Sequence, residues 1–197
     1  MIIHIADALH SVKRKLALVI SPPVTVDLSN PKEQHVTHGF NKEDFDQLKD
    51  TIDYFSLMTY DYTQYIKKVG PNAPLEWVKT NIKYLSDEKK YLKKILLGLN
   101  FFGYKYQFDR ASNKLLANPE AVLGQQFIQM ISDDWKYNYD SKSGEHIFVK
   151  ENDKTTELVW YPTLHSINQR IELAESLGTG LSIWELGQGL DYFFDLF

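Results

Sequence analysis

The sequence predicts an α/β fold whose strands form a parallel sheet. Four short apolar runs lie along the chain, at residues 16–20, 54–60, 95–102 and 180–184. Segments with helical periodicity separate these runs, and such alternation is typical of right-handed βαβ units. No glycine-rich phosphate loop accompanies them. The pattern leaves two architectures open, a small open doubly wound sheet or half of an eight-stranded barrel.

The helices are predicted from the spacing of apolar residues and from capping signals. Residues 41–44 form a cap before a helix at 45–52, and Asn72 with the following Ala73 and Pro74 opens another helix that reaches residue 85. A first helix is expected at 2–14, and a later one at 166–177, which Gly178 ends.

The pattern changes between residues 103 and 160, where we expect a small α+β insertion. It combines an amphipathic helix at 122–131 with three short strands at 135–140, 146–150 and 157–161. Residues 1–102 then hold the first βα units, and residues 161–197 hold a final helix, strand and helix. The aromatic tail at 192–197 is expected to pack as that last helix.

Composition excludes several classes of function. The 197 residues carry a net charge of −4 from interspersed acidic and basic side chains, so we expect no nucleic acid partner. No apolar run approaches 18 residues and the amino terminus lacks a signal peptide pattern, so we expect no membrane insertion. There is no cysteine. His35 and His38 have no third ligand nearby in the sequence, and we expect neither a metal nor another cofactor.

The candidate binding residues follow two of the apolar runs. Tyr60 and Asp61 end the second run, and Trp184 ends the fourth. Ligands bind at the carboxyl ends of parallel strands in α/β folds. An indole covers the apolar face of a sugar ring, while a phenol and a carboxylate hydrogen-bond the groups at its edge. This combination favours a carbohydrate ligand.

Each candidate also has a purely structural interpretation. Met58 fits core packing, because methionine fills gaps in apolar cores. Tyr60 and Asp61 could tie down the loop after the strand. Trp184 could be a buried core indole. Asn100 lies inside an apolar run and must be satisfied there, either by the backbone or by a ligand.

Taken together, three segments resemble glycoside hydrolase family 18, the family of chitinases and chitinase-like lectins. They are Met58-Thr59-Tyr60-Asp61, the segment 97–103 that reads LGLNFFG, and Trp184. Their order and spacing agree with the family, and the likeness covers essentially the whole chain. The resemblance implies the C-terminal half of a (β/α)8 TIM barrel, strands five to eight, with the α+β insertion between the last two strands.

The resemblance also implies a site and a set of partners. The substrate-binding residues would be Met58, Tyr60, Asp61, Asn100 and Trp184, with an oligosaccharide of N-acetylglucosamine as the ligand. The family's catalytic glutamate ends a D-x-x-D-x-D-x-E motif, which does not occur in residues 1–197. We therefore expect no catalytic residue in this chain and a chitinase-like carbohydrate-binding protein.

Two other functions remain open from the sequence. The chain could be part of an active hydrolase, or it could be an interaction module, since the family includes a member that binds a stabilin-type receptor. The resemblance points to a secreted or lysosomal location. A half barrel would also expose two sheet edges and its apolar interior, which predicts self-association.

Overall fold

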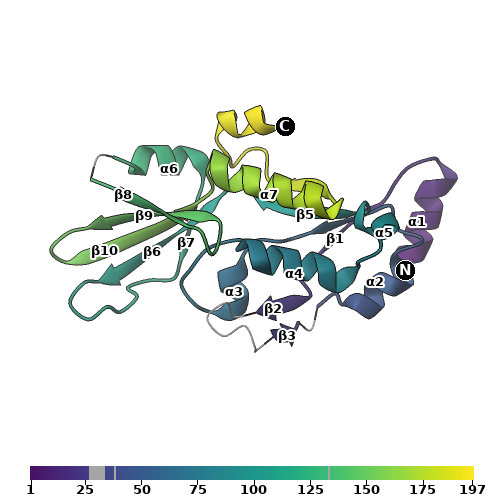
Figure 1. Ribbon diagram of the computed structural model, residues 1–197, viewed down its shortest axis with the longest axis horizontal. Helices are drawn as coiled ribbons and strands as arrows, with labels where there is room; N and C mark the ends of the chain where they lie inside the picture. Colours follow the sequence, from purple (N-terminus) through teal and green to yellow (C-terminus); the bar gives the residue numbers. More distant parts are fainter. Residues whose placement is uncertain (27–33, 38, 133) are drawn as a thin grey trace. The chain divides into compact units, whose positions relative to one another are not determined.

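The computed structural model describes residues 1–26, 34–37, 39–132 and 134–197. The chain forms two compact units (Figure 1). The first contains Met1–Tyr60, Glu76–Leu99 and Ile171–Ser182, and the second contains Asp61–Leu75, Asn100–Arg170 and Ile183–Phe197. His38 and most of the polar loop before residue 34 lie outside the described residues.

The first unit is built on a four-stranded sheet in the order β1-β4-β5-β11. Its strands are β1 (Ala17–Ile20), β4 (Tyr54–Leu57), β5 (Ile95–Asn100) and β11 (Gly180–Trp184). The pairs β1–β4 and β4–β5 are parallel, which confirms the predicted parallel sheet. The strands β4 and β5 end earlier than expected, at Leu57 and Asn100. A short antiparallel pair, β2 (Val24–Val26) and β3 (Gln34–Val36), was not expected.

The helices of the first unit match the sequence prediction in part, because the second ends at Leu48 rather than at residue 52 and the helix Lys89–Leu92 was not expected. They are α1 (Ile2–Ser11), α2 (Lys42–Leu48), α4 (Leu75–Leu85), α5 (Lys89–Leu92) and the second half of α7 (Leu164–Leu177). The predicted cap is present, because the Asn41 side chain accepts from the Asp44 amide and the Asp44 side chain accepts from the Asn41 amide. Such a capping box fixes where α2 begins.

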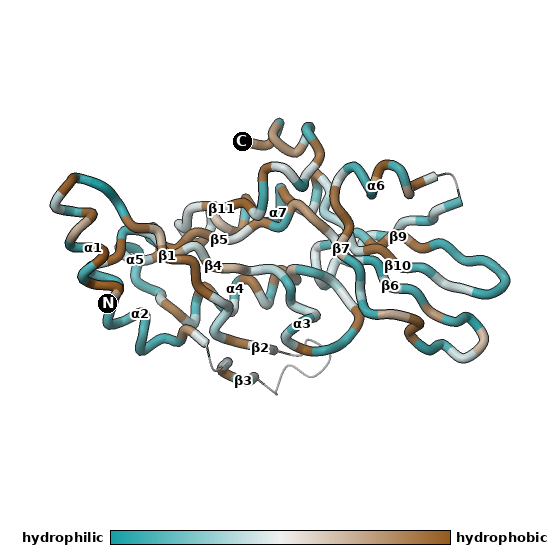
Figure 2. The backbone as a smooth tube through the Cα atoms, turned by 180° about the vertical axis from the view of Figure 1, so that it is seen from behind, coloured by the Kyte–Doolittle hydropathy of each residue, from teal (hydrophilic) through white to brown (hydrophobic). Residues whose placement is uncertain are grey.

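Alternation along the strands separates a buried face of the sheet from an open one. Phe55, Leu57, Ile95 and Leu97 are fully buried. The intervening position Ser56 pairs with Val19 of β1, whose side chain is 58% exposed. The edge strand β1 is coloured hydrophobic in Figure 2, although only its last residue, Ile20, is buried. One face of this sheet therefore carries the core of the first unit.

The second unit is built on a five-stranded antiparallel sheet in the order β7-β6-β10-β9-β8. Its strands are β6 (Gly103–Asp109), β7 (Glu120–Val122), β8 (Lys136–Asp140), β9 (Glu145–Glu151) and β10 (Thr155–Tyr161). The unit also contains α3 (Tyr62–Ile66), α6 (Gly124–Met130), the first half of α7 and the 3-10 helix Asp191–Leu196. The tail is thus helical, as predicted, but in the tighter 3-10 form.

Aromatic rings hold α6 against this sheet. Phe127 of α6 stacks on Tyr161 of β10 at 3.9 Å between ring centroids and meets Phe148 of β9 edge-on at 4.9 Å. The ring centroid of Phe193, in the 3-10 helix, lies 6.3 Å from that of Tyr161. Buried aromatic pairs of this kind add packing energy beyond their apolar area.

The insertion was predicted with too few strands. Three strands were expected, whereas the sheet has five, because β6 and β7 were missed. Val122 was placed in a helix and is instead buried in β7. The strand β6 alternates Tyr104, Tyr106 and Phe108 with polar residues, which is a period-two signal of a strand with two different faces. That signal was present in the sequence.

Candidate functional site

Met58 and Tyr60 lie in the first unit, directly after β4. The amide of Met58 donates to the Ile20 carbonyl at 3.0 Å and its side chain is half-buried, while Tyr60 is buried. Thr59 is buried between them and its hydroxyl donates to the Gly98 carbonyl at 2.8 Å. A Cβ at Gly98 would collide with the Leu57 carbonyl, so only glycine lets β5 pass here.

Asp61 opens the second unit and is held by two hydrogen bonds. Its backbone adopts the left-handed conformation, with φ of 64°, which non-glycine residues adopt rarely. The Asp61 amide donates to Asn72 Oδ1 at 2.7 Å, and the Tyr104 hydroxyl donates to Asp61 Oδ1 at 2.9 Å. The amide contact fixes the backbone, and the phenol contact fixes the carboxyl group.

The Asp61 and Tyr104 side chains also shift each other's pKa. Burial raises the pKa of the Asp61 carboxyl, and the hydrogen bond from Tyr104 acts against this shift. The pKa of Tyr104 is raised by burial and by the Asp61 charge. The Tyr104 hydroxyl therefore stays protonated at neutral pH and donates a hydrogen bond to the Asp61 carboxyl group.

Asn72 supports the Asp61–Tyr104 pair through its contact with Asp61, and Asn72 is itself buried. Its side chain accepts from the Asp61 amide and donates to the Phe102 carbonyl at 3.3 Å. Its own amide donates to Glu145 Oε2 at 2.9 Å. The sequence had indicated Asn72 only as the start of a helix, yet its side chain connects Asp61 to the sheet of the second unit.

Glu145 and Arg170 form a buried ion pair beneath Asn72. Arg170 donates to Glu145 Oε1 at 3.0 Å and to the carbonyls of Ala73, Gly144 and Ser166. Glu145 also accepts from the Ala73 amide at 2.6 Å. Burial raises the pKa of Glu145, and Arg170 with the two backbone amides opposes that shift. A buried charge pair with this many partners fixes the geometry around it.

Asn100 has a backbone partner. It is 6% exposed, and its side-chain amide donates to the Phe102 carbonyl at 2.8 Å. The same carbonyl accepts from Asn72, so a single oxygen joins the two asparagines. This contact answers how the polar group is satisfied inside an apolar run.

Trp184 is exposed rather than buried. Its side chain is 52% exposed, which excludes the interpretation as a core indole. Its carbonyl accepts from the Phe101 amide at 2.8 Å, and the bond to Glu185 is cis. Just beyond, a Cβ at Gly189 would collide with the Phe101 ring, so the small residue there has a steric reason.

Within the second unit, a short segment therefore brings three predicted residues together. Residue 101 binds the Trp184 carbonyl, and residue 102 binds the side chains of Asn100 and of Asn72, which holds Asp61. Sequence reasoning missed Asn72, Tyr104, Glu145 and Arg170. In the described residues, no group of three or more His, Asp or Glu side chains is arranged to hold a metal ion. None of the helices described in the structure is long and apolar enough to span a membrane.

The comparison with known families identifies the class of protein. Glycosyl hydrolases family 18 matches residues 7–189, which is most of the chain, and the chain belongs to this family. The match covers Met58, Tyr60, Asp61, Asn100 and Trp184.

Solved structures share the fold. A chitinase from Chromobacterium violaceum ATCC 12472 is 20% identical with a TM-score of 0.74, and 99% of this chain aligns with 58% of that one. The spore cortex-lytic enzyme SleL from Bacillus megaterium QM B1551 is 18% identical with a TM-score of 0.76, covering 97% of this chain and 42% of that one.

A class V chitinase from Nicotiana tobaccum, solved in complex with NAG4, is 13% identical with a TM-score of 0.67, covering 96% of this chain and 57% of that one. This chain thus spans about half the length of the proteins it matches. The fold is a chitinase-like α/β fold with a parallel sheet.

Proposed function

We propose that this chain binds chitooligosaccharides and does not itself hydrolyse them. The observation that supports this most concerns Asp61, whose carboxyl accepts from Tyr104 and whose backbone amide donates to Asn72, in the same unit that exposes the Trp184 indole. The indole would stack on the apolar face of a sugar ring, and the carboxylate would accept from its hydroxyl or amide groups.

Binding without hydrolysis is proposed because residues 1–197 do not contain the motif that carries the family's catalytic glutamate. In the family, as the resemblance implies, the substrate's own acetamido group attacks while the glutamate of D-x-x-D-x-D-x-E protonates the leaving oxygen. Residues 1–197 contain no such motif. Without general acid catalysis such a reaction slows by about 10²–10⁴-fold, while stacking and hydrogen bonding remain. The alternative is that this chain is part of an active hydrolase whose acid lies elsewhere.

A titration with N-acetylglucosamine tetramer tests the binding proposal. Tryptophan fluorescence and calorimetry should both report binding, and the Trp184→Ala variant should lose it. Tyr137→Ala is the matched control, because Tyr137 is an aromatic residue that is 73% exposed. No heat and no fluorescence change at millimolar ligand would contradict the proposal. Release of sugar from a chromogenic chitobioside by the purified chain would favour the hydrolase alternative.

We also propose that the four-stranded sheet corresponds to strands five to eight of an eight-stranded barrel. The support is its parallel order and its open face, on which Val19 is exposed. Such a face favours self-association through the uncovered sheet. Analytical ultracentrifugation should detect dimers or larger species. A compact monomer that binds no hydrophobic dye would count against this proposal.

Within the family, we propose that the chain is most like the chitinase domain-containing protein, also called stabilin-interacting chitinase-like protein. The likeness is carried by residues 55–62, 71–77, 94–101 and 182–193. It is the basis for proposing a secretory or lysosomal route and a stabilin-type receptor as partner. A pull-down with a stabilin ectodomain tests the receptor, and Trp184→Ala should leave it bound if the interface differs from the sugar site.

A further inference from the structure

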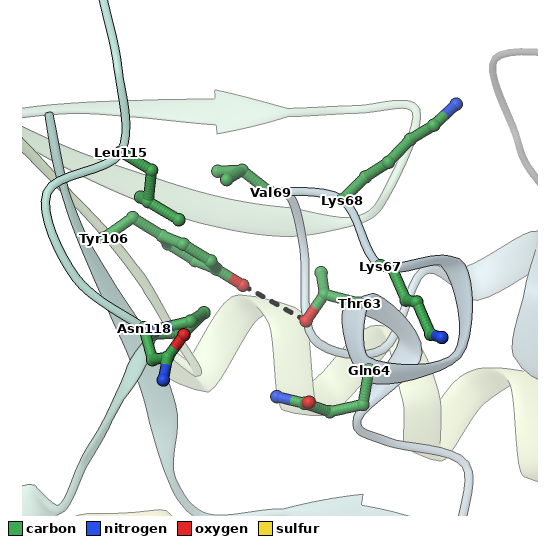
Figure 3. A pocket seen from close by; sticks show the side chains of 9 residues that line it. Thr63, Gln64, Lys67, Lys68, Val69, Tyr106, Leu115 and Asn118 are labelled. Carbon is green, nitrogen blue, oxygen red and sulfur yellow. Dashed lines mark hydrogen bonds between the residues drawn. The ribbon is translucent and has the colours of Figure 1, made fainter.

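The two edges of the antiparallel sheet in the second unit differ. Near one edge, Tyr106 of β6 and Thr63 of α3 are hydrogen-bonded at 3.1 Å and line a pocket of about 270 Å³ (Figure 3). The edge strand beyond β6 is β7, which has only three residues. At the opposite edge, β8 has five residues, and in the described part of the chain no strand pairs with its outer side.

Strand β8 is open to solvent over most of its length. Lys136, Tyr137 and Asn138 are exposed, and Tyr137 is 73% exposed. The pairing with β9 continues from Lys136 to Asp140 without a bulge, and the strand contains no proline. Short length, bulges and proline are the usual devices that shield an edge strand from another chain. Because β8 has none of them, its outer backbone N–H and C=O groups are available to a further strand.

Alternation divides the side chains of β8 between two faces. Tyr137 and Tyr139 lie on one face, each beside an aromatic ring of β9. Lys136, Asn138 and Asp140 lie on the other face. The two ends of this second face therefore carry opposite charges, and a neutral residue lies midway between them.

This arrangement makes β8 complementary to a second copy of itself. When two copies pair antiparallel about Asn138, Lys136 of each copy faces Asp140 of the other, and Tyr137 faces Tyr139. Opposite charges and aromatic rings that face each other stabilise a cross-strand pair, whereas like charges destabilise it. A shift by one residue would turn the tyrosines of the two copies to opposite faces. A parallel copy would place lysine beside lysine and aspartate beside aspartate.

We propose that two copies of this chain associate through β8, which joins their antiparallel sheets about a twofold axis at Asn138. This surface lies within the second unit and is separate from the sheet of the first unit, for which self-association is proposed above. Five residues from each copy form a small interface, so the dimer is weak and is studied at up to about 1 mM protein.

Two charge reversals test the pairing. Lys136→Glu places a second carboxylate opposite Asp140, and Asp140→Lys places a second ammonium opposite Lys136. In sedimentation equilibrium at low salt, each variant alone should dimerise about tenfold more weakly than the unaltered protein. An equimolar mixture of the two should restore the dimer, because every facing charge pair is then complementary. Lys154→Glu, the same change on the exposed turn between β9 and β10, should dimerise normally.

A second readout keeps both charges in place. Asp140 also accepts from the Lys142 amide at 3.1 Å in the turn after β8, so circular dichroism must first show that the Asp140 variant is folded. Asn138→Cys avoids this change, and because the chain has no cysteine, a spin label attached there reports a single position. In the proposed dimer the two labels face each other, so their spectrum should broaden as the protein concentration rises. A label on Lys154→Cys should not broaden.

The outcomes decide between β8 and other surfaces. A single monomeric species at about 1 mM protein would overturn the proposal. A dimer that Lys136→Glu leaves intact, with no broadening at residue 138, would also overturn it and would point to another surface, such as the sheet of the first unit. If both variants are folded and their mixture still fails to dimerise, the charge-matched register is wrong. Recovery of the dimer in the mixture, together with broadening at residue 138, would support the proposal.

Discussion

Both units bury aromatic and aliphatic side chains, but they differ in the charges that they bury. The first packs rings and aliphatic groups, with Phe45 and Phe55 at 4.8 Å between centroids and Ile82 fully buried nearby in α4. The second buries an ion pair, Glu145 with Arg170, beneath the polar site. Apolar packing tolerates small changes of shape, whereas a buried charge network holds only when every partner is present. The second unit therefore adds a fixed arrangement of buried polar groups to an apolar core of the kind that both units contain.

Removing Arg170 should produce the largest effect. Arg170→Met leaves Glu145 buried without its partner, and we expect a loss of about 3–5 kcal/mol in the free energy of unfolding, measured by urea denaturation. Lys105→Ala, which breaks the pair of Lys105 with Glu157 at 2.9 Å, whose side chains are 24% and 19% exposed, should cost less, about 1 kcal/mol. Equal losses in the two variants would mean that the buried network has no special role.

Asn72→Ala should have a smaller effect on stability but a direct effect on the site. It leaves the Asp61 amide without its acceptor, at a cost of about 1–3 kcal/mol. Because Asp61 then loses its backbone support, sugar affinity should fall by more than the stability loss alone explains. Asn72→Asp keeps an oxygen for the Asp61 amide and should recover part of that affinity in calorimetry. Full sugar binding by the alanine variant would argue against a positioning role for Asn72.

Trimming the apolar core of the first unit should affect stability only. Ile82→Val removes one buried methylene, and we expect a loss of about 0.5–1.5 kcal/mol by thermal or urea denaturation. The sugar affinity of this variant, measured under conditions where the protein is folded, should not change. A weakened sugar affinity would contradict this prediction, because it would show that a change in the core of the first unit alters the binding site.

The pH dependence of stability gives the finest test of the polar site. The raised pKa of Asp61 favours its protonated form in the folded protein, so its contribution to stability is present below the unfolded value of about 4 and is lost as the pH rises through the folded pKa. The unaltered protein should therefore lose stability relative to Asp61→Asn as the pH rises above about 4. A stability difference that stays constant across this range would show that Asp61 is not shifted.

The sequence was sufficient for local features whose signals are local. The cap at Asn41, the start of α4 after Pro74 and the strand at 180–184 could all be predicted, because each depends on residues a few positions apart. Trp184 ends β11 as predicted, whereas Asp61 lies beyond the end of β4 at Leu57 and precedes α3. The sequence could not predict whether Trp184 is buried or exposed, because the neighbouring Ile183 and Leu186 are compatible with a core indole and with an exposed one.

The support beneath the site could not be predicted, for a physical reason. Glu145 and Arg170 are 25 residues apart, and Glu145 meets the Asn72 amide across 73 residues. No periodicity relates such positions, and an isolated Glu or Arg in a sequence is more often exposed. Asn72 itself looked like an ordinary helix start. Only β6 was a missed signal rather than an absent one, because its alternation was visible.

The two hydrogen bonds that Asn72 makes to residues 61 and 62 have a practical consequence for changing this protein. The Asp61 amide donates to the Asn72 side chain, and the Tyr62 amide donates to the Asn72 carbonyl at 2.9 Å. The stretch between them, residues 63–71, contains most of α3 and is closed into a loop at its base by these two hydrogen bonds. Such a loop could be exchanged as a cassette to alter ligand preference without rebuilding the carboxylate at its root.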